Sequence, residues 1–211
     1  MYLIVKRIID IILATFLILI LLIPMLIVAI FIKVEDGDSV IYKSKRVGKG
    51  LKEFNAYKFR SMKTHRKELE SNFTHEEMVT RVGKFIRKTS IDELPQLFNI
   101  LKGEMSFVGP RPWIPEYYES FTEEQKRRAS VLPGISGLAQ TKGRNGIDIF
   151  KKIEYDLKYV DNISFALDVE IFVESFLEVL KKNNAEISEQ GIKDEINQLK
   201  NQNKNVNTIN I

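Results

Sequence analysis

The sequence predicts a mainly helical α+β protein in which an N-terminal membrane helix precedes a compact domain. Three observations support this fold class. Residues 11–32 form an uncharged apolar run, residues 39–42 and 53–59 are β-prone stretches around a glycine-containing turn, and later segments alternate helical periodicity with Gly/Pro-rich loops. We therefore predict a membrane segment at 1–33, a compact domain at 34–184 and a polar, partly disordered tail at 185–211.

The apolar run is long enough to cross a membrane. Its 22 residues would make a straight helix about 33 Å long, which matches a hydrocarbon core. A cleaved signal peptide is disfavoured because the run is too long and no small-residue cleavage site follows it.

Two features argue against a simple crossing. Pro24 lies inside the run, where it removes a helical hydrogen bond and clashes with the carbonyl of Ile20. Lys6 and Arg7 precede the run and Lys33 follows it, so both ends favour the cytoplasmic side. A re-entrant helix broken at Pro24 satisfies both ends, but kinked spanning helices are common, and the residues alone leave both topologies open.

The charge distribution points towards anionic partners. Residues 33–67 hold eleven Lys or Arg against four Asp or Glu, within a chain whose formal net charge is only +4. Such a segment suits phosphates, an anionic membrane surface or nucleic acid. The chain has no cysteine, which excludes disulfides and thiolate chemistry, and its two histidines are too few for a histidine-based metal site.

Three helices are predicted in the second half of the chain. Thr122 and Gln125 have capping-box spacing at the start of a helix over 122–131. Apolar residues recur at helical spacing over 147–160, and a further helix runs from Ser164 to about residue 182. The last is apolar over much of its circumference, so it is either a core helix or seated on the membrane surface.

The acids Asp92 and Glu93 are the first candidates for chemistry. Ser90 and Glu93 also have capping-box spacing, so helix capping is the structural alternative. Capping leaves unexplained why Arg87 and Lys88 lie immediately upstream and why the run sits between two glycine-containing stretches that carry arginines. Acids among fixed arginines suggest a site that handles a metal and phosphates.

Three basic positions are candidate phosphate ligands. Arg111 lies between Pro110 and Pro112, which restrict its backbone and lower the cost of presenting its guanidinium, although a solvated turn would look the same. Arg144 follows a glycine that allows close backbone approach, a weak signal by itself. Lys58 alternates with aromatic residues, as in nucleic-acid-binding strands or in a solvated edge strand.

Taken together, these stretches resemble the bacterial sugar transferase family, the monotopic phosphoglycosyl transferases, in its short single-domain form. The resemblance runs from residue 6 to about residue 182. Its carriers are YKFRSM (57–62), IRKTSIDELPQLFNILKGEMSFVGPRP (86–112) and PGISGLAQTKGRN (133–145). The long middle run is very specific.

The resemblance implies an enzyme that transfers a sugar phosphate. Asp92 would be the nucleophile that attacks the phosphate next to the sugar of a UDP-sugar and expels UMP. Undecaprenyl phosphate would then attack the phosphosugar–aspartyl intermediate. Glu93 would hold Mg²⁺ as well as acting in catalysis, and Asp156 would be a further functional acid. The remaining site residues would bind the phosphates: Lys58, Arg87, Arg111 and Arg144.

The resemblance also implies a location and partners. It favours a re-entrant membrane helix, with Lys6, Arg7 and Pro24 as its anchor, on the cytoplasmic face of a bacterial inner membrane. Some members have Ser before this proline, whereas this chain has Ile23. The domain at 34–184 would be the cytoplasmic catalytic domain, with interfacial helices.

The product would start a glycoprotein glycan, capsule or O-antigen and pass to downstream glycosyltransferases. The short members often use UDP-linked N-acetylated amino sugars. The competing hypothesis is a non-catalytic membrane adaptor whose basic segment binds anionic lipid or nucleic acid. The adaptor does not explain the acids among arginines, so we predict no nucleic-acid partner.

Overall fold

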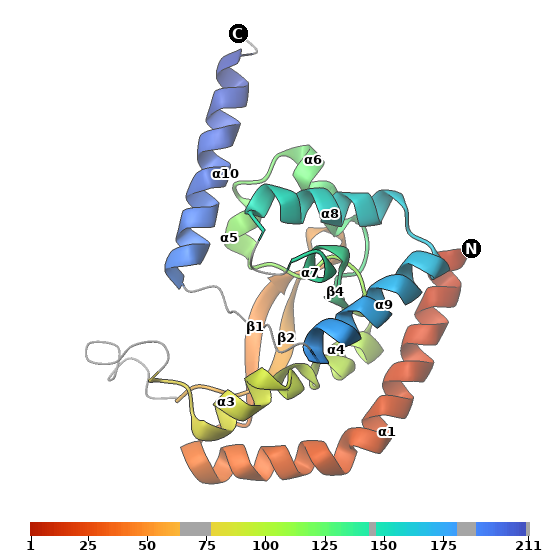
Figure 1. Ribbon diagram of the computed structural model, residues 1–211, viewed down its shortest axis with the longest axis vertical. Coiled ribbons are helices and arrows are strands. Elements are labelled where there is room, and N and C mark those ends of the chain that lie inside the picture. Colours follow the sequence, from red (N-terminus) through yellow and green to blue (C-terminus); the bar gives the residue numbers. More distant parts are fainter. Residues whose placement is uncertain (64–76, 144–146, 181–188, 210–211) are drawn as a thin grey trace.

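The computed structural model describes residues 1–63, 77–143, 147–180 and 189–209. It is a mainly helical α+β protein, which confirms the predicted class (Figure 1). In chain order, the elements are α1 (Tyr2–Asp36), β1 (Ile41–Val47), β2 (Glu53–Phe59), α3 (Arg81–Lys88), α4 (Gln96–Lys102), β3 (Ser106–Val108), α5 (Pro115–Tyr118), α6 (Glu123–Lys126), β4 (Gly134–Ser136), α7 (Leu138–Thr141), α8 (Ile149–Asp161), α9 (Phe165–Leu180) and α10 (Glu189–Ile209). Short 3₁₀ helices occupy Lys49–Leu51, Ile91–Glu93 and Arg127–Ser130.

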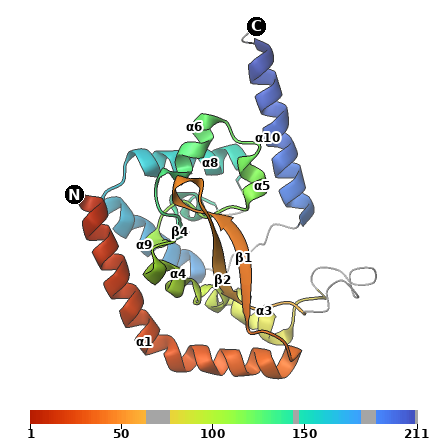
Figure 2. The same ribbon diagram turned by 180° about the vertical axis from the view of Figure 1, so that it is seen from behind.

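Helix α1 is 35 residues long and contains Pro24. Figures 1 and 2 show it turning sharply between two halves, so that it lies along two sides of the body. Ala14 packs in the buried cluster around α4 and β3, Met25 packs in the cluster with Phe59, and Leu21 contacts both clusters. The two halves of α1 therefore rest on different parts of the domain.

The outer surface of α1 is apolar. Many of its large hydrophobic side chains are exposed, among them Ile12, Leu19 and Ile23. Within the described ranges, α1 is the helix whose length and composition would allow it to cross a membrane. A surface of this kind is stable against lipid rather than water, which indicates a membrane-bound protein.

The predicted hairpin is confirmed, with a longer first strand than the sequence indicated. β1 pairs antiparallel with β2, and Tyr42 faces Lys58 across the pair. The first strand begins at Ile41 and continues through the basic residues to Val47. These basic residues have little β-propensity of their own, so pairing with β2 sets the extent of the strand.

Two glycines fix the loops near the site. A Cβ on Gly83 would lie 2.1 Å from the carbonyl oxygen of Ser61, so glycine lets α3 pack directly against the segment that follows β2. A Cβ on Gly134 would lie 2.1 Å from the backbone nitrogen of Gly109. Glycine there allows β3 and β4 to pair in parallel, and Gly134 N donates to Pro110 O at 3.1 Å. This pairing holds one side of the loop that carries Arg111.

The helices of the second half follow the predictions with shifted ends. The capping box of Thr122 and Gln125 is confirmed, but α6 ends at Lys126 and a 3₁₀ turn replaces its expected continuation. Helix α8 begins after Asp148, whose carboxylate accepts from the nitrogens of Phe150 and Lys151. Helix α9 buries Ile171 and exposes several large apolar side chains: Phe165, Val169, Phe172, Val173, Phe176 and Leu177.

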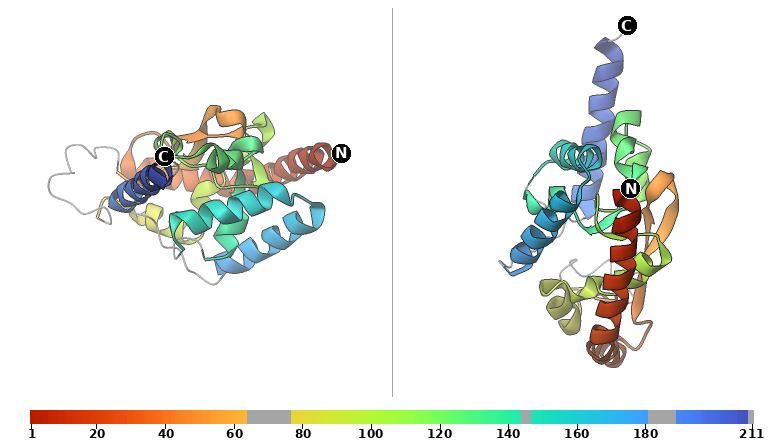
Figure 3. Two further views of the ribbon diagram at one scale, coloured as in Figure 1. Left: turned by 90° about the horizontal axis from the view of Figure 1, so that it is seen from above. Right: turned by 90° about the vertical axis from the view of Figure 1, so that its right-hand side faces the viewer.

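The polar C-terminal segment contains α10, although its composition favoured partial disorder. Three apolar side chains at helical spacing pack against the buried cluster around Tyr117: Ile192, Ile196 and Leu199. Lys152 Nζ lies 2.6 Å from Glu195 Oε1 and ties α10 to α8. Beyond these contacts α10 projects away from the body (Figure 3). The boundary predicted at 184/185 lies outside the described residues.

Candidate active site

The backbone around the acid pair is not a helix cap. Ser90 adopts a left-handed conformation (φ 58°, ψ 15°), and its side chain makes no capping hydrogen bond. The capping-box interpretation of Ser90 and Glu93 is therefore wrong. A left-handed conformation is uncommon for serine, and here it begins the 3₁₀ turn on which Asp92 and Glu93 lie.

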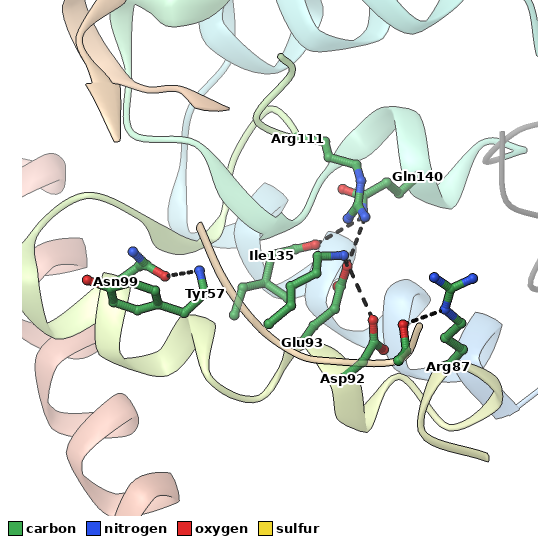
Figure 4. Close-up of polar contacts among 10 residues, drawn as sticks. Tyr57, Arg87, Asp92, Glu93, Asn99, Arg111, Ile135 and Gln140 are labelled. Atoms are coloured by element: carbon green, nitrogen blue, oxygen red, sulfur yellow. Dashed lines mark hydrogen bonds and ion pairs between the residues drawn. The ribbon is translucent and has the colours of Figure 1, made fainter. Parts of the chain in front are cut away.

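Two cations hold Glu93 from different elements. Lys58 Nζ on β2 lies 2.7 Å from Glu93 Oε1, and Arg111 Nη2 lies 2.8 Å from the same oxygen. Lys58 Nζ also lies 3.9 Å from Asp92 Oδ2, so this lysine bridges the two acids. Figure 4 shows that Arg111 approaches the Glu93 carboxylate from one side, and that the backbone of Asp92 and Glu93 lies on the other side. The structure thus brings together four residues from three segments of the chain: Lys58, the Asp92–Glu93 pair and Arg111.

The site is enclosed at the acids and open at Arg111. The side chains of Asp92 and Glu93 are 12% and 18% exposed, whereas that of Arg111 is 41% exposed. Burial opposes ionisation of Glu93, but Arg111 and Lys58 outweigh burial and hold the pKa of Glu93 well below its ordinary value. Glu93 is therefore an anion at neutral pH, and an anionic ligand would approach from the side of Arg111.

The depressed pKa of Glu93 predicts a pH-dependent contribution to stability. A carboxylate with a lowered folded-state pKa stabilises the fold above its unfolded value, here 4.5, and loses that contribution as the pH falls towards the folded-state pKa. The difference in unfolding free energy between the unchanged protein and Glu93→Gln should be constant from pH 7 to about pH 5. It should shrink below about pH 4.5. Chemical denaturation in detergent at several pH values measures it, and a difference that grows on acidification would contradict the assignment.

Arg87 lies beside the acid pair. Its Nε donates to Ser61 Oγ at 2.8 Å, which fixes the near end of its guanidinium, and Figure 4 shows this side chain beside Asp92. The guanidinium therefore lies at the Asp92 end of the site. Arg144 lies outside the described residues.

Asp156 is not part of this cluster. It is 1% exposed on α8, and its Oδ2 accepts from Arg128 Nε at 2.9 Å. Arg128 in turn donates from Nη2 to the carbonyl oxygen of Arg111 at 2.7 Å and lies over the ring of Trp113, 4.1 Å from its centre. Asp156 thus reaches the site through Arg128 and the backbone of the Arg111 loop.

Sequence reasoning missed Arg128. It was placed on a predicted helix next to Arg127, and nothing in the local pattern distinguishes the two arginines. The structure buries Arg128 to 2% exposure and leaves the Arg127 side chain 44% exposed. Burial lowers the pKa of Arg128, but the Asp156 carboxylate outweighs burial, so its pKa is raised overall. Only the tertiary fold shows which of the two arginines supports the site.

The predicted anchor residues all lie on α1. Lys6 Nζ pairs with Asp168 Oδ2 on α9 at 2.6 Å. Arg7 Nη1 and Nη2 donate to the carbonyl oxygens of Ile100 and Leu101, at 2.6 and 3.0 Å, at the end of α4. These contacts fasten the start of α1 to the domain.

The acid pair has the right donors for a magnesium ion. Among the described residues, no group of three or more His, Cys, Asp or Glu forms a ready-made metal cage. Mg²⁺ usually binds through one or two carboxylates together with substrate phosphates. Glu93, the predicted metal ligand, offers a carboxylate of this kind.

The fold and the site define a class of protein. The site is a partly buried carboxylate pair held by cations. It lies on a domain that packs against a long apolar helix. Together, these features are typical of a membrane-bound enzyme that acts on a phosphate-bearing substrate. The family model for bacterial sugar transferases matches residues 1–182. The chain belongs to the bacterial sugar transferase family.

Individual relatives agree with this membership. The chain is 44% identical to the uncharacterized sugar transferase EpsL of Bacillus subtilis, over 84% of this chain and 88% of the relative. It is 38% identical to the undecaprenyl-phosphate galactose phosphotransferase of Salmonella typhimurium, over 85% of this chain and 41% of the relative. It is 41% identical to the UDP-N-acetylgalactosamine-undecaprenyl-phosphate N-acetylgalactosaminephosphotransferase of Aeromonas hydrophila, over 85% of this chain and 44% of the relative. The chain thus spans most of one relative and less than half of the other two.

Proposed function

We propose that this chain is a phosphoglycosyl transferase that moves a sugar 1-phosphate from a UDP-sugar to undecaprenyl phosphate and releases UMP. The observation that supports this most is the Asp92–Glu93 pair held by Lys58 and Arg111. The substrates follow from the names of the relatives in Salmonella and Aeromonas. The product would start a lipid-linked glycan, such as a capsule, O-antigen or glycoprotein glycan, for downstream glycosyltransferases to extend.

The first step is attack by Asp92. A carboxylate is already ionised at pH 7, so it needs no general base to act as a nucleophile. An Asp92 oxygen bonds to the phosphorus next to the sugar, the bond from that phosphorus to the UMP oxygen breaks, and its electron pair leaves with UMP. The product of this step is a phosphosugar–aspartyl ester.

The second step regenerates the enzyme. An oxygen of the lipid phosphate bonds to the same phosphorus, and the bond to Asp92 breaks and returns the carboxylate. Lys58 and Arg111 reduce the repulsion between Asp92 and its anionic substrates, because both cations are already fixed at the acid pair. A Mg²⁺ ion held by Glu93 would supply further neutralisation of the phosphoryl oxygens.

The apolar surfaces of α1 and α9 suit a lipid acceptor. We infer that α1 is re-entrant and that Pro24 causes its turn, because proline removes the hydrogen bond to the carbonyl of Ile20. In addition, the part of α1 before Leu21 packs on one buried cluster and the part after it packs on another. Both ends of α1 then lie on the cytoplasmic face, as their positive residues favour. Helix α9 would rest in the interface and hold the site at the membrane surface.

The topology can be tested by cysteine labelling, since the chain has no native cysteine. Single cysteines at Leu3 and Val34 should both resist a membrane-impermeant reagent added to intact cells and both react after permeabilisation. A cysteine at Ser39, in the following loop, serves as the cytoplasmic reference. Labelling of Leu3→Cys but not Val34→Cys from outside would instead establish a spanning helix.

The reaction can be tested by screening UDP-sugars for UMP release in the presence of undecaprenyl phosphate and Mg²⁺. The screen should include the sugars in the names of two relatives, galactose and N-acetylgalactosamine, together with glucose. One of the UDP-sugars tested is expected to give UMP and a lipid diphosphate sugar, with ping-pong kinetics. Release of UDP would identify an ordinary glycosyltransferase. Lipid binding without consumption of any UDP-sugar would favour the adaptor hypothesis.

A further inference from the structure

Arg46 is a partly buried arginine close to the candidate site, in a stretch of basic residues that carries no motif. It lies near the end of β1, and among the described residues its guanidinium makes no hydrogen bond or ion pair. A partly buried cation without a counter-ion is unfavourable unless a ligand supplies the negative charge. The arginine therefore needs an explanation that the folded chain alone does not give.

The register of the hairpin places Arg46 on the same face as Lys58. Arg46 pairs with Phe54, and Lys58 pairs with Tyr42, four residue pairs farther along the hairpin. Directly paired residues and every second residue of an antiparallel pair share one face. Ser44 and Ala56, which lie between Arg46 and Lys58 on this face, are buried. The face that presents Lys58 to the acid pair also carries Arg46 and is turned towards the body.

A backbone contact brings the same strand end to the Arg111 loop. Val47 N donates to Trp113 O at 2.9 Å, so the residue after Arg46 is fixed two residues beyond Arg111. Burial and the nearby Arg111 charge both lower the pKa of Arg46, and the weaker opposing influences are Tyr42, Glu116 and, last, Glu93. Two neighbouring arginines that repel each other are not a structural ion pair, and an anionic ligand between them would relieve the repulsion.

We propose that Arg46 and Arg111 form a subsite for the phosphate of the UDP-sugar that leaves as UMP. Lys58 contacts both acids, Arg111 contacts Glu93, and Arg46 lies on the Arg111 side of the site. The phosphorus that Asp92 attacks must lie at the Asp92 end. The second phosphate of the donor is therefore directed towards Arg46, where positive charge stabilises the oxygen that leaves with UMP. This assignment rests on the proposed function.

The experiment compares Arg46→Gln with Arg46→Lys and with Lys45→Gln as the matched control. Lys45 is the exposed neighbour on the opposite face and pairs with Glu53 at 2.7 Å. Arg46→Gln should raise the KM for the UDP-sugar and weaken inhibition by UMP about 10- to 100-fold, the effect of losing a charge-assisted hydrogen bond. Arg46→Lys should recover part of the loss, and Lys45→Gln should behave as the unchanged protein.

Three outcomes would overturn the subsite. Unchanged UMP inhibition in Arg46→Gln would do so. A raised KM for undecaprenyl phosphate alone would assign Arg46 to the acceptor phosphate instead. Equal loss in Arg46→Lys and Arg46→Gln, together with a lowered melting temperature, would mean a merely structural role.

Direct binding of UMP, measured by calorimetry on each variant without any sugar donor, separates this proposal from the proposed function. Tight UMP binding that depends on Arg46, in a chain that turns over no UDP-sugar, would support the subsite while the reaction fails. If the protein turns over a UDP-sugar but the Arg46 variants bind UMP as tightly as the unchanged protein, the proposed reaction stands and the Arg46 subsite is wrong.

Discussion

Asp92→Asn is expected to abolish transfer of the sugar phosphate. Asparagine keeps the size of the side chain but presents a neutral amide, which is not a competent nucleophile at phosphorus. Loss of a nucleophile that forms a covalent intermediate should reduce turnover by about 10³-fold or more. UMP release from a radiolabelled UDP-sugar, with and without undecaprenyl phosphate, measures the effect.

The same experiment tests the covalent intermediate. Without acceptor, the unchanged protein should retain radiolabel from the sugar after denaturation, and Asp92→Asn should retain none. Asp194→Asn, on the exposed surface of α10, is the matched control and should label normally. The Asp92→Asn protein should also fold, because Lys58 still pairs with Glu93 at 2.7 Å. Full turnover by Asp92→Asn would remove Asp92 from the role of nucleophile.

The sequence predicted those parts of the molecule that depend on local pattern. The apolar run of α1, the hairpin and the capping box of Thr122 are set by neighbouring residues, and the structure contains all three. The extent of β1 was underestimated, because pairing with β2 rather than propensity sets it. Likewise, α10 is helical despite its polar composition, because Leu199 and the isoleucines on the same face find a buried surface to pack against.

Within the site, spacing alone favoured a structural role for Asp92 and Glu93. The left-handed Ser90 and the cations from β2 and from the Arg111 loop show why spacing was insufficient. These contacts join segments that lie far apart in the chain, and no local pattern encodes them. Arg46 and Arg128 were missed for the same reason, since each looks like a solvated arginine until the fold supplies its surroundings.

Asp156→Asn is expected to be among the most destabilising single changes in the domain. It removes the carboxylate from a buried ion pair and leaves Arg128 without its charge partner at 2% exposure. Breaking a buried pair in this way costs about 3–5 kcal/mol. Chemical unfolding in detergent measures it. The matched control is Asp161→Asn, which breaks the contact between Asp161 and the adjacent arginine, Arg127. Both of those side chains are exposed, at 48% and 44%, so that change should have little effect on stability.

A double variant separates stability from positioning. Replacing the pair with apolar residues, as in R128M/D156L, should restore much of the lost stability because it removes both buried charges. It should not restore activity, because Arg128 Nη2 would no longer hold the carbonyl oxygen of Arg111. The expected result is a nearly normal unfolding midpoint with a raised KM for the UDP-sugar. Recovery of both would show that the pair only stabilises the domain, whereas recovery of stability alone establishes that Asp156 acts on the site through Arg128 and the loop that presents Arg111.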